Sequence, residues 1–259
     1  MPLSDSQQGK ILTLLRTKMD EKIRKYNRET SSMPFMTRLI QDEELVASFS
    51  FMISLATTLG MSIFERVAQI IGEENSEESK CSVKIGGMIG PERKLLIAQI
   101  VNDLRQGRRI PNKKQESQEI LNVSNANAVY QKEGNVADFY MKKNGAEYYF
   151  EIKTVKPNID VFTASKRKML EWVAIKDKMI YSMVALPYNP YAPEPYQRFT
   201  EQNLLDRNEE LKVGNEFWNL LGGEGTYEQL LDIFDRVGKE YKSSLKTLLQ
   251  KAGRRVSAT

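Results

Sequence analysis

The chain has 259 residues, of which 41% are hydrophobic and 28% are charged, as in an ordinary globular protein. Its 38 basic and 34 acidic side chains give a formal net charge of +4, which permits a polyanionic partner without requiring one. The chain contains no histidine and a single cysteine, Cys81. This composition excludes histidine-based catalytic triads, nucleases with a histidine base, structural zinc and an intrachain disulfide. A bound metal ion would therefore need oxygen ligands, as Mg²⁺, Mn²⁺ and Ca²⁺ do.

The N-terminal part of the chain is predicted to be helical. Apolar residues at helical spacing predict an amphipathic helix over residues 6–28. The stretch from Leu45 to Phe64 carries no charge and is about as long as a membrane span. It contains several serines and threonines and Gly60, and acids rather than a Lys/Arg cluster flank it. We therefore expect a buried pair of helices broken near Gly60, and no membrane span.

The rest of the chain alternates predicted helices and strands. In chain order, the patterns predict a helix over 91–105, a basic loop over 105–114, a strand pair over 136–154, a helix over 165–178, a strand over 179–186 and a Pro/Tyr-rich loop over 187–196. Thr226, with Gln229 three places on, is expected to cap a C-terminal helix. This order predicts a mixed α/β domain, with a helical segment over 1–40, a core over 42–186 and a C-terminal loop and helical region over 187–259.

The segment "VADFYMKKNGAEYYFEIKT", residues 136–154, predicts a β-hairpin. Asn144-Gly145 lies between its two strand-like runs, and an Asn-Gly turn favours a two-residue hairpin because both residues adopt positive φ. With these two residues in the turn, Lys143 faces Ala146. The turn therefore predicts the pairing register of both strands.

This register brings charged side chains onto one face of the hairpin. Asp138 falls opposite Glu151, and opposed side chains share a face with their Cβ atoms about 5 Å apart. Lys153 lies on the same face because side chains alternate with a period of two. The apolar residues of the opposite face point into a core: Phe139, Phe150 and Ile152. Opposed like charges are destabilising, so either a divalent cation or the lysine is expected to neutralise the acids. The alternative is a solvated face without function.

Asp138, Glu151 and Lys153, within "VAD…EIK", resemble the motif of the PD-(D/E)XK nuclease superfamily, although Ala137 stands in place of the usual proline. The order of helix, strand, hairpin, helix and strand is also similar. The C-terminal half resembles type II restriction endonucleases, in particular the group that cuts GGNCC-like sites. The segments that carry this second resemblance are "FEIKTVKPNID", "ASKRKMLEW", "ALPYNPYAPEPYQRFT" and "VGNEFWNLLGGEGTYEQLLDIF".

The resemblance implies a mixed central sheet flanked by helices, with helical additions at both ends. It also implies a homodimer that cuts double-stranded DNA at a short palindromic site and leaves 5′-phosphate and 3′-hydroxyl ends. The catalytic residues would be Asp138, Glu151 and Lys153, and the two acids with the carbonyl of Ile152 would hold Mg²⁺, for which Mn²⁺ could substitute. An acid on the first core helix often joins such a site, which implies Glu65. The alternative for Glu65 is a capping box with Ser62.

Basic clusters are the candidate DNA contacts, because phosphate contacts position a protein on DNA and arginine can read guanine. The candidates are Arg105, Arg108, Arg109, Lys113, Lys114, Lys166, Arg167 and Lys168. A solvated surface is the alternative for each cluster.

Other functions are compatible with the same residues. They are a DNA repair or recombination nuclease, a junction resolvase, and a nucleic-acid-binding protein without catalytic activity. The single cysteine and the polar N-terminus favour a reducing, cytoplasmic location, which the resemblance implies to be prokaryotic.

Overall fold

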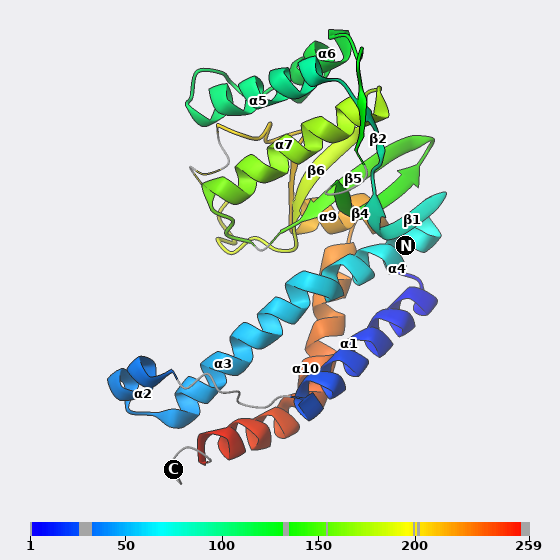
Figure 1. Cartoon of the computed structure of the whole chain (residues 1–259). Helices are drawn as coiled ribbons and strands as arrows, with labels where there is room; N and C mark the ends of the chain where they lie inside the picture. Colours follow the sequence, from blue (N-terminus) through cyan, green and yellow to red (C-terminus); the bar gives the residue numbers. More distant parts are fainter. Residues whose placement is uncertain are drawn as a thin grey trace. The chain divides into compact units, whose positions relative to one another are not determined.

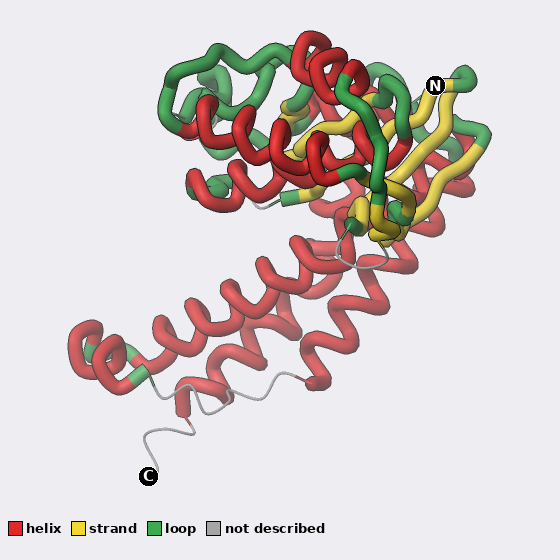
Figure 2. The backbone as a smooth tube through the Cα atoms, turned by 45° about the horizontal axis from the view of Figure 1, so that its top comes forward, coloured by secondary structure: helices red, strands yellow, loops and turns green. Residues whose placement is uncertain are grey.

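The computed structural model describes residues 2–25, 33–131, 135–153, 155–198, 200 and 203–254. The chain forms two compact units. Residues 68–225 make up the first, termed here the sheet unit, and residues 1–67 together with 226–259 make up the second, termed the helical unit. Figure 2 shows that the strands gather in one unit and that the other is built from helices. This division differs from the expected segments, because the first and last parts of the chain belong to one unit.

A five-stranded mixed sheet forms the centre of the sheet unit, with the strand order β1-β4-β5-β6-β7 (Figure 1). The pairs β1–β4 and β4–β5 are antiparallel, whereas β5, β6 and β7 run parallel to one another. The strands of this sheet are β1 (Glu78–Lys84), β4 (Val136–Lys143), β5 (Ala146–Ile152), β6 (Tyr181–Leu186) and β7 (Leu211–Val213). A separate antiparallel pair is formed by β2 (Gly87–Ile89) and β3 (Val129–Gln131). The mixed central sheet with flanking helices agrees with the expected α/β class.

Helices cover both faces of the sheet. The helices of this unit are α5 (Pro91–Arg105), α6 (Lys113–Asn122), α7 (Ile159–Lys176) and α9 (Asn215–Gly222). On one face the ring of Tyr149 lies 6.0 Å from Trp172 of α7, between ring centroids. On the other face Phe150 lies 5.5 Å from Phe217 of α9. Successive residues of β5 therefore point alternately toward α7 and toward α9.

The hairpin has the register that its turn predicts. Asn144 and Gly145 have φ angles of 52° and 74°, and Lys143 pairs with Ala146. The same register continues to the pair Phe139 and Phe150, whose rings are buried 5.5 Å apart. The predicted apolar face is thereby confirmed.

Side-chain caps set where two helices begin. Asn158 accepts a hydrogen bond from the backbone N–H of Val161 and caps α7, so this helix begins before the predicted residue 165. Its basic triplet, residues 166–168, consequently lies in the helix interior and not in the first turn. Asn112 caps α6 in the same way, so the end of the predicted basic loop is helical.

The helical unit contains one long helix that the sequence predicted to be broken. Its elements are α1 (Asp5–Lys25), α2 (Pro34–Ile40), α3 (Glu43–Thr58), the π-helical segment η1 (Leu59–Ile63) and α10 (Thr226–Arg254), and α4 (Phe64–Asn75) follows η1 directly. The predicted break near Gly60 is wrong, because Leu59 and Phe64 keep right-handed helical φ and ψ angles. The end of the predicted first helix, residues 26–28, lies outside the described residues.

Polar contacts join α10 to the first helix. Arg16 and Glu240 form an ion pair of 2.6 Å, and Tyr241 donates a hydrogen bond of 2.6 Å to Asp20. The side-chain oxygen of Gln229, predicted to help cap α10, accepts a hydrogen bond from the backbone N–H of Leu3. These contacts hold the N-terminal helix α1 against the C-terminal helix α10 within this unit.

Only part of α3 is buried, in contrast to the prediction. Val46, Ala47 and Phe51 are buried, whereas Leu45 and Met52 are 55% and 62% exposed. No helix in the described part of the chain is both long and apolar enough to cross a bilayer.

Candidate active site

The two predicted acids meet at the end of the hairpin. Continued past Phe139 and Phe150, the register places Asp138 opposite Glu151. The backbone N–H of Ile152 donates a hydrogen bond of 2.8 Å to Oδ2 of Asp138, which fixes the Asp138 carboxylate against β5. Glu151 is 1% exposed, so both acids lie in a site partly shielded from solvent.

Two lysines neutralise these acids. Lys153 directs its Nζ between them, with an ion pair to Oε2 of Glu151 and a distance of 3.4 Å to Oδ2 of Asp138. Lys168 of α7 forms an ion pair with Oε1 of Glu151. Its Nζ also lies 5.6 Å from the ring centroid of Trp172, one helical turn further on. Because α7 covers the face toward which Glu151 points, the helix supplies the second ammonium group.

Burial and charge alter the pKa values at this site. Burial raises the pKa of Asp138 above its ordinary value, and the nearby Glu151 carboxylate raises it further. Burial lowers the pKa of Lys153, but the attraction of Glu151 and then of Asp138 outweighs burial and raises it overall. Lys153 therefore carries its proton at neutral pH.

The donor set fits a hard divalent cation. Oε1 of Glu151 is buried and, apart from its ion pair with Lys168, has no hydrogen-bond partner in the described part of the chain. Two carboxylates in close proximity suit Mg²⁺, which usually takes one or two protein carboxylates and keeps several waters. Across the described ranges no group of three or more acidic, histidine or cysteine side chains is arranged to hold a metal.

Glu65 lies in the first turn of α4, in the helical unit. The capping-box alternative for this residue is wrong. Ser62 is part of η1, and its hydroxyl donates a hydrogen bond of 3.3 Å to the carbonyl of Thr58. No helix begins at Ser62, so the serine has no cap to provide. The role of Glu65 as a metal-site acid stays a prediction.

A cleft of about 380 Å³ lies beside Lys168 on the surface of α7. Its lining residues are Arg105, Asn135, Asp160, Thr163, Ala164, Arg167, Lys168 and Glu171. Arg105 is paired with Asp160 across this cleft at 2.7 Å. The cleft thus brings together three of the predicted DNA-contacting residues, Arg105, Arg167 and Lys168, and Lys168 is the one that also pairs with Glu151.

The other basic residues lie elsewhere in the sheet unit. Arg108 pairs with Asp103 at 2.6 Å and Arg109 with Glu119 at 2.7 Å. Lys114 is exposed and lines a cavity of about 450 Å³ at the beginning of β6. Because β5 and β6 run parallel, with Glu151 beside Val184, the acids lie toward the other end of these strands.

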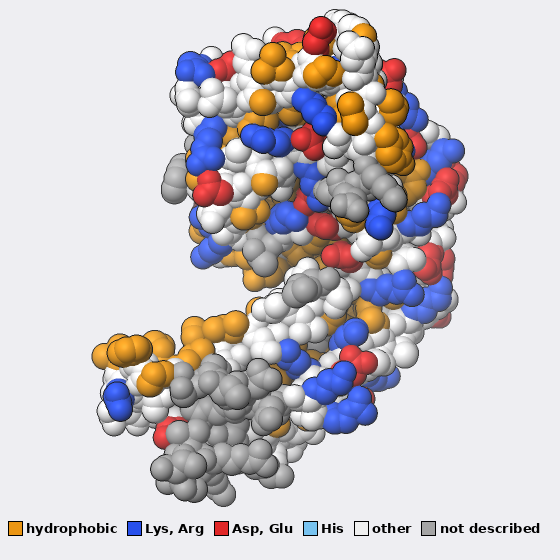
Figure 3. Space-filling view, in the orientation of Figure 1, with side chains coloured by type: hydrophobic (Ala, Val, Ile, Leu, Met, Phe, Trp, Pro, Cys, Tyr) orange, Lys and Arg blue, Asp and Glu red, His pale blue; other side chains and the backbone are white. Residues whose placement is uncertain are grey.

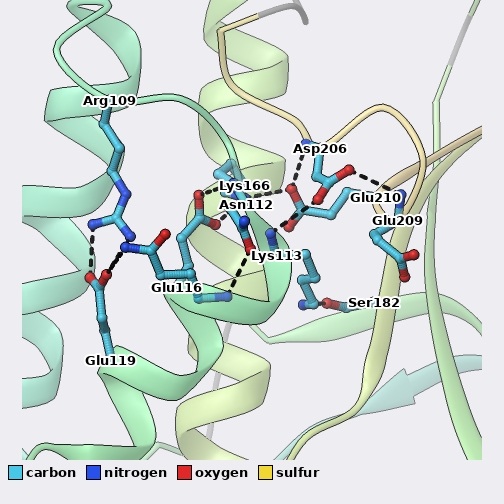
Figure 4. Close-up of polar contacts among 11 residues, drawn as sticks. Arg109, Asn112, Lys113, Glu116, Glu119, Lys166, Ser182, Asp206, Glu209 and Glu210 are labelled. Carbon is cyan, nitrogen blue, oxygen red and sulfur yellow. Dashed lines mark hydrogen bonds and ion pairs between the residues drawn. The ribbon is translucent and has the colours of Figure 1, made fainter.

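Two of the predicted DNA-contacting lysines are inside the protein (Figure 4). Lys166 is fully buried and forms ion pairs of 2.5 Å with both Glu116 and Glu210. Lys113 is 5% exposed and donates a hydrogen bond to Ser182. These positions argue against the predicted phosphate contacts, because a phosphate cannot reach an enclosed ammonium group without opening the structure.

The buried charges join four segments of the sheet unit. Lys166 belongs to α7, Glu116 to α6 and Ser182 to β6, and Glu210 precedes β7. Oε2 of Glu210 also accepts a hydrogen bond of 2.9 Å from the backbone N–H of Asp206. This network fixes α7 against its neighbours and thereby positions Lys168 for its contact with Glu151.

The position of Lys168 against Glu151 was not predicted from the sequence, in which Lys168 stands in a basic triplet with Lys166 and Arg167 that suggested phosphate contacts. In a helix, neighbouring residues point in different directions, and here Lys166 is buried, Lys168 is directed to the site and Arg167 lines the cleft. Trp172 one turn after Lys168 is the signal in the sequence that could have marked this face of α7.

A mixed five-stranded sheet flanked by helices, with two acids and a lysine at the end of a hairpin, is compatible with a restriction-endonuclease-like fold. The family model described as "Type II restriction endonuclease, HinfI" matches residues 3–238. The chain therefore belongs to the HinfI family of type II restriction endonucleases.

Curated relatives carry similar descriptions. The type II restriction enzyme MjaII of Methanocaldococcus jannaschii is 30% identical over 203 residues, which are 71% of this chain and 53% of that enzyme. The type II restriction enzymes HgiCII and HgiEI of Herpetosiphon aurantiacus are 28% and 26% identical, over 72% and 70% of their lengths. The chain thus spans about half of MjaII. No solved structure matches the chain significantly.

Proposed function

We propose that the chain is a type II restriction endonuclease with a PD-(D/E)XK core. It would hydrolyse phosphodiester bonds of double-stranded DNA at a short palindromic site, with Mg²⁺, and leave 5′-phosphate and 3′-hydroxyl ends. The observation that supports this most is the meeting of Asp138, Glu151 and Lys153 at the end of the hairpin, in a chain of the HinfI family. A GGNCC-like site, a homodimer and a prokaryotic cytoplasm belong to the same proposal.

Asp138 and Glu151 would hold the cation, together with the backbone carbonyl of Ile152. When bound, Mg²⁺ polarises the scissile phosphate and lowers the pKa of a water, and Mn²⁺ is expected to substitute for it. The hydrogen bond from the N–H of Ile152 to Asp138 orients this carboxylate before the ion binds.

Lys153 would act as a positioned cation. The attraction of Glu151 and Asp138 outweighs burial and raises the pKa of Lys153, which favours the ammonium form as a hydrogen-bond donor. An ammonium group between two carboxylates can orient the attacking water and stabilise the negative charge that grows on the phosphate during reaction.

Lys168 would have two roles in turn. Without substrate it neutralises Oε1 of Glu151. It also borders the cleft that Arg167 and Thr163 line, where a phosphate oxygen can accept its hydrogen bonds. The DNA backbone is therefore proposed to pass over this side of α7 and to reach the acids from there. Of the predicted DNA contacts, this cleft supports Arg105, Arg167 and Lys168.

Digestion of plasmid DNA of known sequence tests the proposed function. Discrete fragments with Mg²⁺, and none with a chelator, are expected, and sequencing of the fragment ends gives the site and the overhang. A smear of products would favour a repair or recombination nuclease, and cleavage of branched DNA alone would favour a junction resolvase. Binding without cleavage in any divalent metal would indicate a non-catalytic DNA-binding protein.

A further inference from the structure

The helical unit exposes an apolar surface on α2 and α3, and Figure 3 shows hydrophobic side chains gathered there. We term it the α2–α3 face. Its members are Phe35, Met36, Leu39, Ile40, Leu45, Phe49, Met52 and Ile53, which are between 37% and 85% exposed. They are eight of the 17 large hydrophobic side chains that are exposed in the described part of the chain. Such side chains are usually scattered singly over a surface, so their concentration here indicates an interface.

The sequence of α3 supports a second contact surface. Val46, Ala47 and Phe51 are buried within the unit. Leu45, Phe49, Met52 and Ile53 follow the helical spacing of an apolar stripe on another side. After Glu44 the helix carries no charged residue. A surface helix normally has a charged outer face, and α3 has serines and threonines between two apolar stripes instead.

The size of this face matches half of a stable protein interface. At roughly 180 Å² for each fully exposed large apolar side chain, the exposed fractions of the eight residues correspond to about 800 Å². That is close to what one partner buries in a standard complex, and it exceeds the largest apolar patch of most monomers.

We propose that the α2–α3 face is the surface through which two copies of this chain associate. The charges next to it favour a second copy over a membrane. Among residues 34–58, Arg38 is the single basic residue, whereas Asp42, Glu43 and Glu44 are acidic. A helix that binds an anionic lipid surface instead carries Lys and Arg beside its apolar face. In a two-fold contact the same patch meets itself, so the exposed Arg38 of one copy can meet the acids of the other.

The α2–α3 face would provide the contact of the homodimer in the proposed function and rests on that proposal in this respect, although its apolar surface is independent of nuclease activity. A two-fold dimer would present two equal sites to a palindromic sequence. Figure 1 marks α2 and α3 within the helical unit, whereas Asp138 and Glu151 belong to the sheet unit. Substitutions on the α2–α3 face therefore leave the catalytic residues unchanged.

Sedimentation velocity of the whole chain at micromolar concentrations tests the proposal. The wild type is expected to have twice the 29.8 kDa mass of the chain. The double substitution Phe49→Ser and Met52→Ser should weaken dimerisation at least about 100-fold, as loss of central interface residues does. Leu95→Ser is the matched control, since Leu95 of α5 is 72% exposed outside this face, and it should leave the dimer intact. Circular dichroism and urea unfolding check that each variant is folded.

Three outcomes would overturn the proposal. The first is a wild type that is monomeric at every concentration. The second is a wild-type dimer whose affinity the double substitution changes no more than Leu95→Ser does. The third is a monomeric chain that floats with anionic vesicles. Plasmid cleavage by the same samples separates the two proposals. A monomer that cuts DNA refutes the dimer surface and the proposed homodimer but leaves the proposed nuclease activity. A dimer that the double substitution dissociates but that never cuts DNA refutes the nuclease activity alone.

Discussion

Lys168 of α7 forms an ion pair with Glu151, the acid at the end of β5. Glu151 is thereby enclosed by two ammonium groups, because Lys153 contacts its other carboxylate oxygen. An acid that is to hold a divalent cation has to exchange at least one of these partners for the ion. Lys168, whose side chain comes from a different element and borders the cleft, is the partner that we expect to leave.

Lys168→Met should therefore raise the affinity for a divalent cation and lower the rate of DNA cleavage. Removal of a competing positive charge is expected to tighten Mn²⁺ binding at least about tenfold, or about 1.4 kcal/mol. Titration calorimetry without DNA measures this directly. Lys178→Met is the control, since Lys178 pairs with Glu147 away from the site, and it should change neither quantity. Unchanged or weaker Mn²⁺ binding by Lys168→Met would contradict this role.

Glu65→Gln separates a role in the metal site from a structural one. If Glu65 completes the site, cleavage should fall about 100-fold or more, as loss of a catalytic electrostatic group does, while the urea midpoint stays within error of the wild type. Glu73→Gln on the same helix α4 is the control and should keep full activity. Cleavage by Glu65→Gln at the wild-type rate would remove this residue from the site.

The buried network around Lys166 should matter more for stability than any surface charge. Lys166→Met would leave Glu116 and Glu210 enclosed without their shared cation, which is expected to destabilise the fold by about 3–5 kcal/mol. Urea unfolding measures the change, with Lys114→Met as the exposed control. Adding Glu116→Gln and Glu210→Gln should restore much of the loss. A loss as small as that of the control would show that the pairing is unimportant.

Lys113 should make the stability depend on pH in an alkaline window. Burial is the main cause that lowers the pKa of Lys113 from 10.5 to about 8. The charge of Glu210 raises this pKa, and the charge of Lys166 lowers it further. Between these values the unfolded chain holds a proton that the folded chain has released, so the stability of the wild type should rise with pH. The slope approaches about 1.4 kcal/mol per pH unit for one proton.

Urea unfolding between pH 8 and 10.5, the window set by the folded and ordinary pKa values of Lys113, compares the wild type with Lys113→Met. The variant should lack this added slope, and Lys114→Met should keep it. Glu116 also faces Lys113, but a glutamate is already ionised in the unfolded chain within this window. Equal slopes for the wild type and Lys113→Met would contradict the prediction.

The hairpin was predictable because its information is local. Asn144 and Gly145 accept positive φ, and this turn alone sets which residues face each other across the strands. Asp138, Glu151 and Lys153 follow from that register without knowledge of the rest of the chain. Their proximity in the structure could therefore be predicted from the turn and from the alternation of side chains along each strand.

The long-range features were not predictable in this way. Lys166 and Arg167 are adjacent basic residues in the sequence, and only packing against Glu116 and Glu210 buries the first of them. The start of α7 is set by the cap at Asn158, whereas the predicted start was placed beside the basic triplet of residues 166–168. Continuity of the long helix past Gly60 depended on a local π-helical segment, for which the sequence carries no strong signal.

Asp138 and Glu151 are proposed to form the catalytic site of a DNA endonuclease. Cleavage of a DNA fragment with a mapped site is measured under single-turnover conditions with Mg²⁺, for the wild type, Asp138→Asn, Glu151→Gln and the control Glu147→Gln. The wild type and the control should cut the fragment, and the other two variants should cut it about 100-fold or more slowly while DNA binding is retained. Wild-type rates for both site variants would exclude these two acids from the catalytic site.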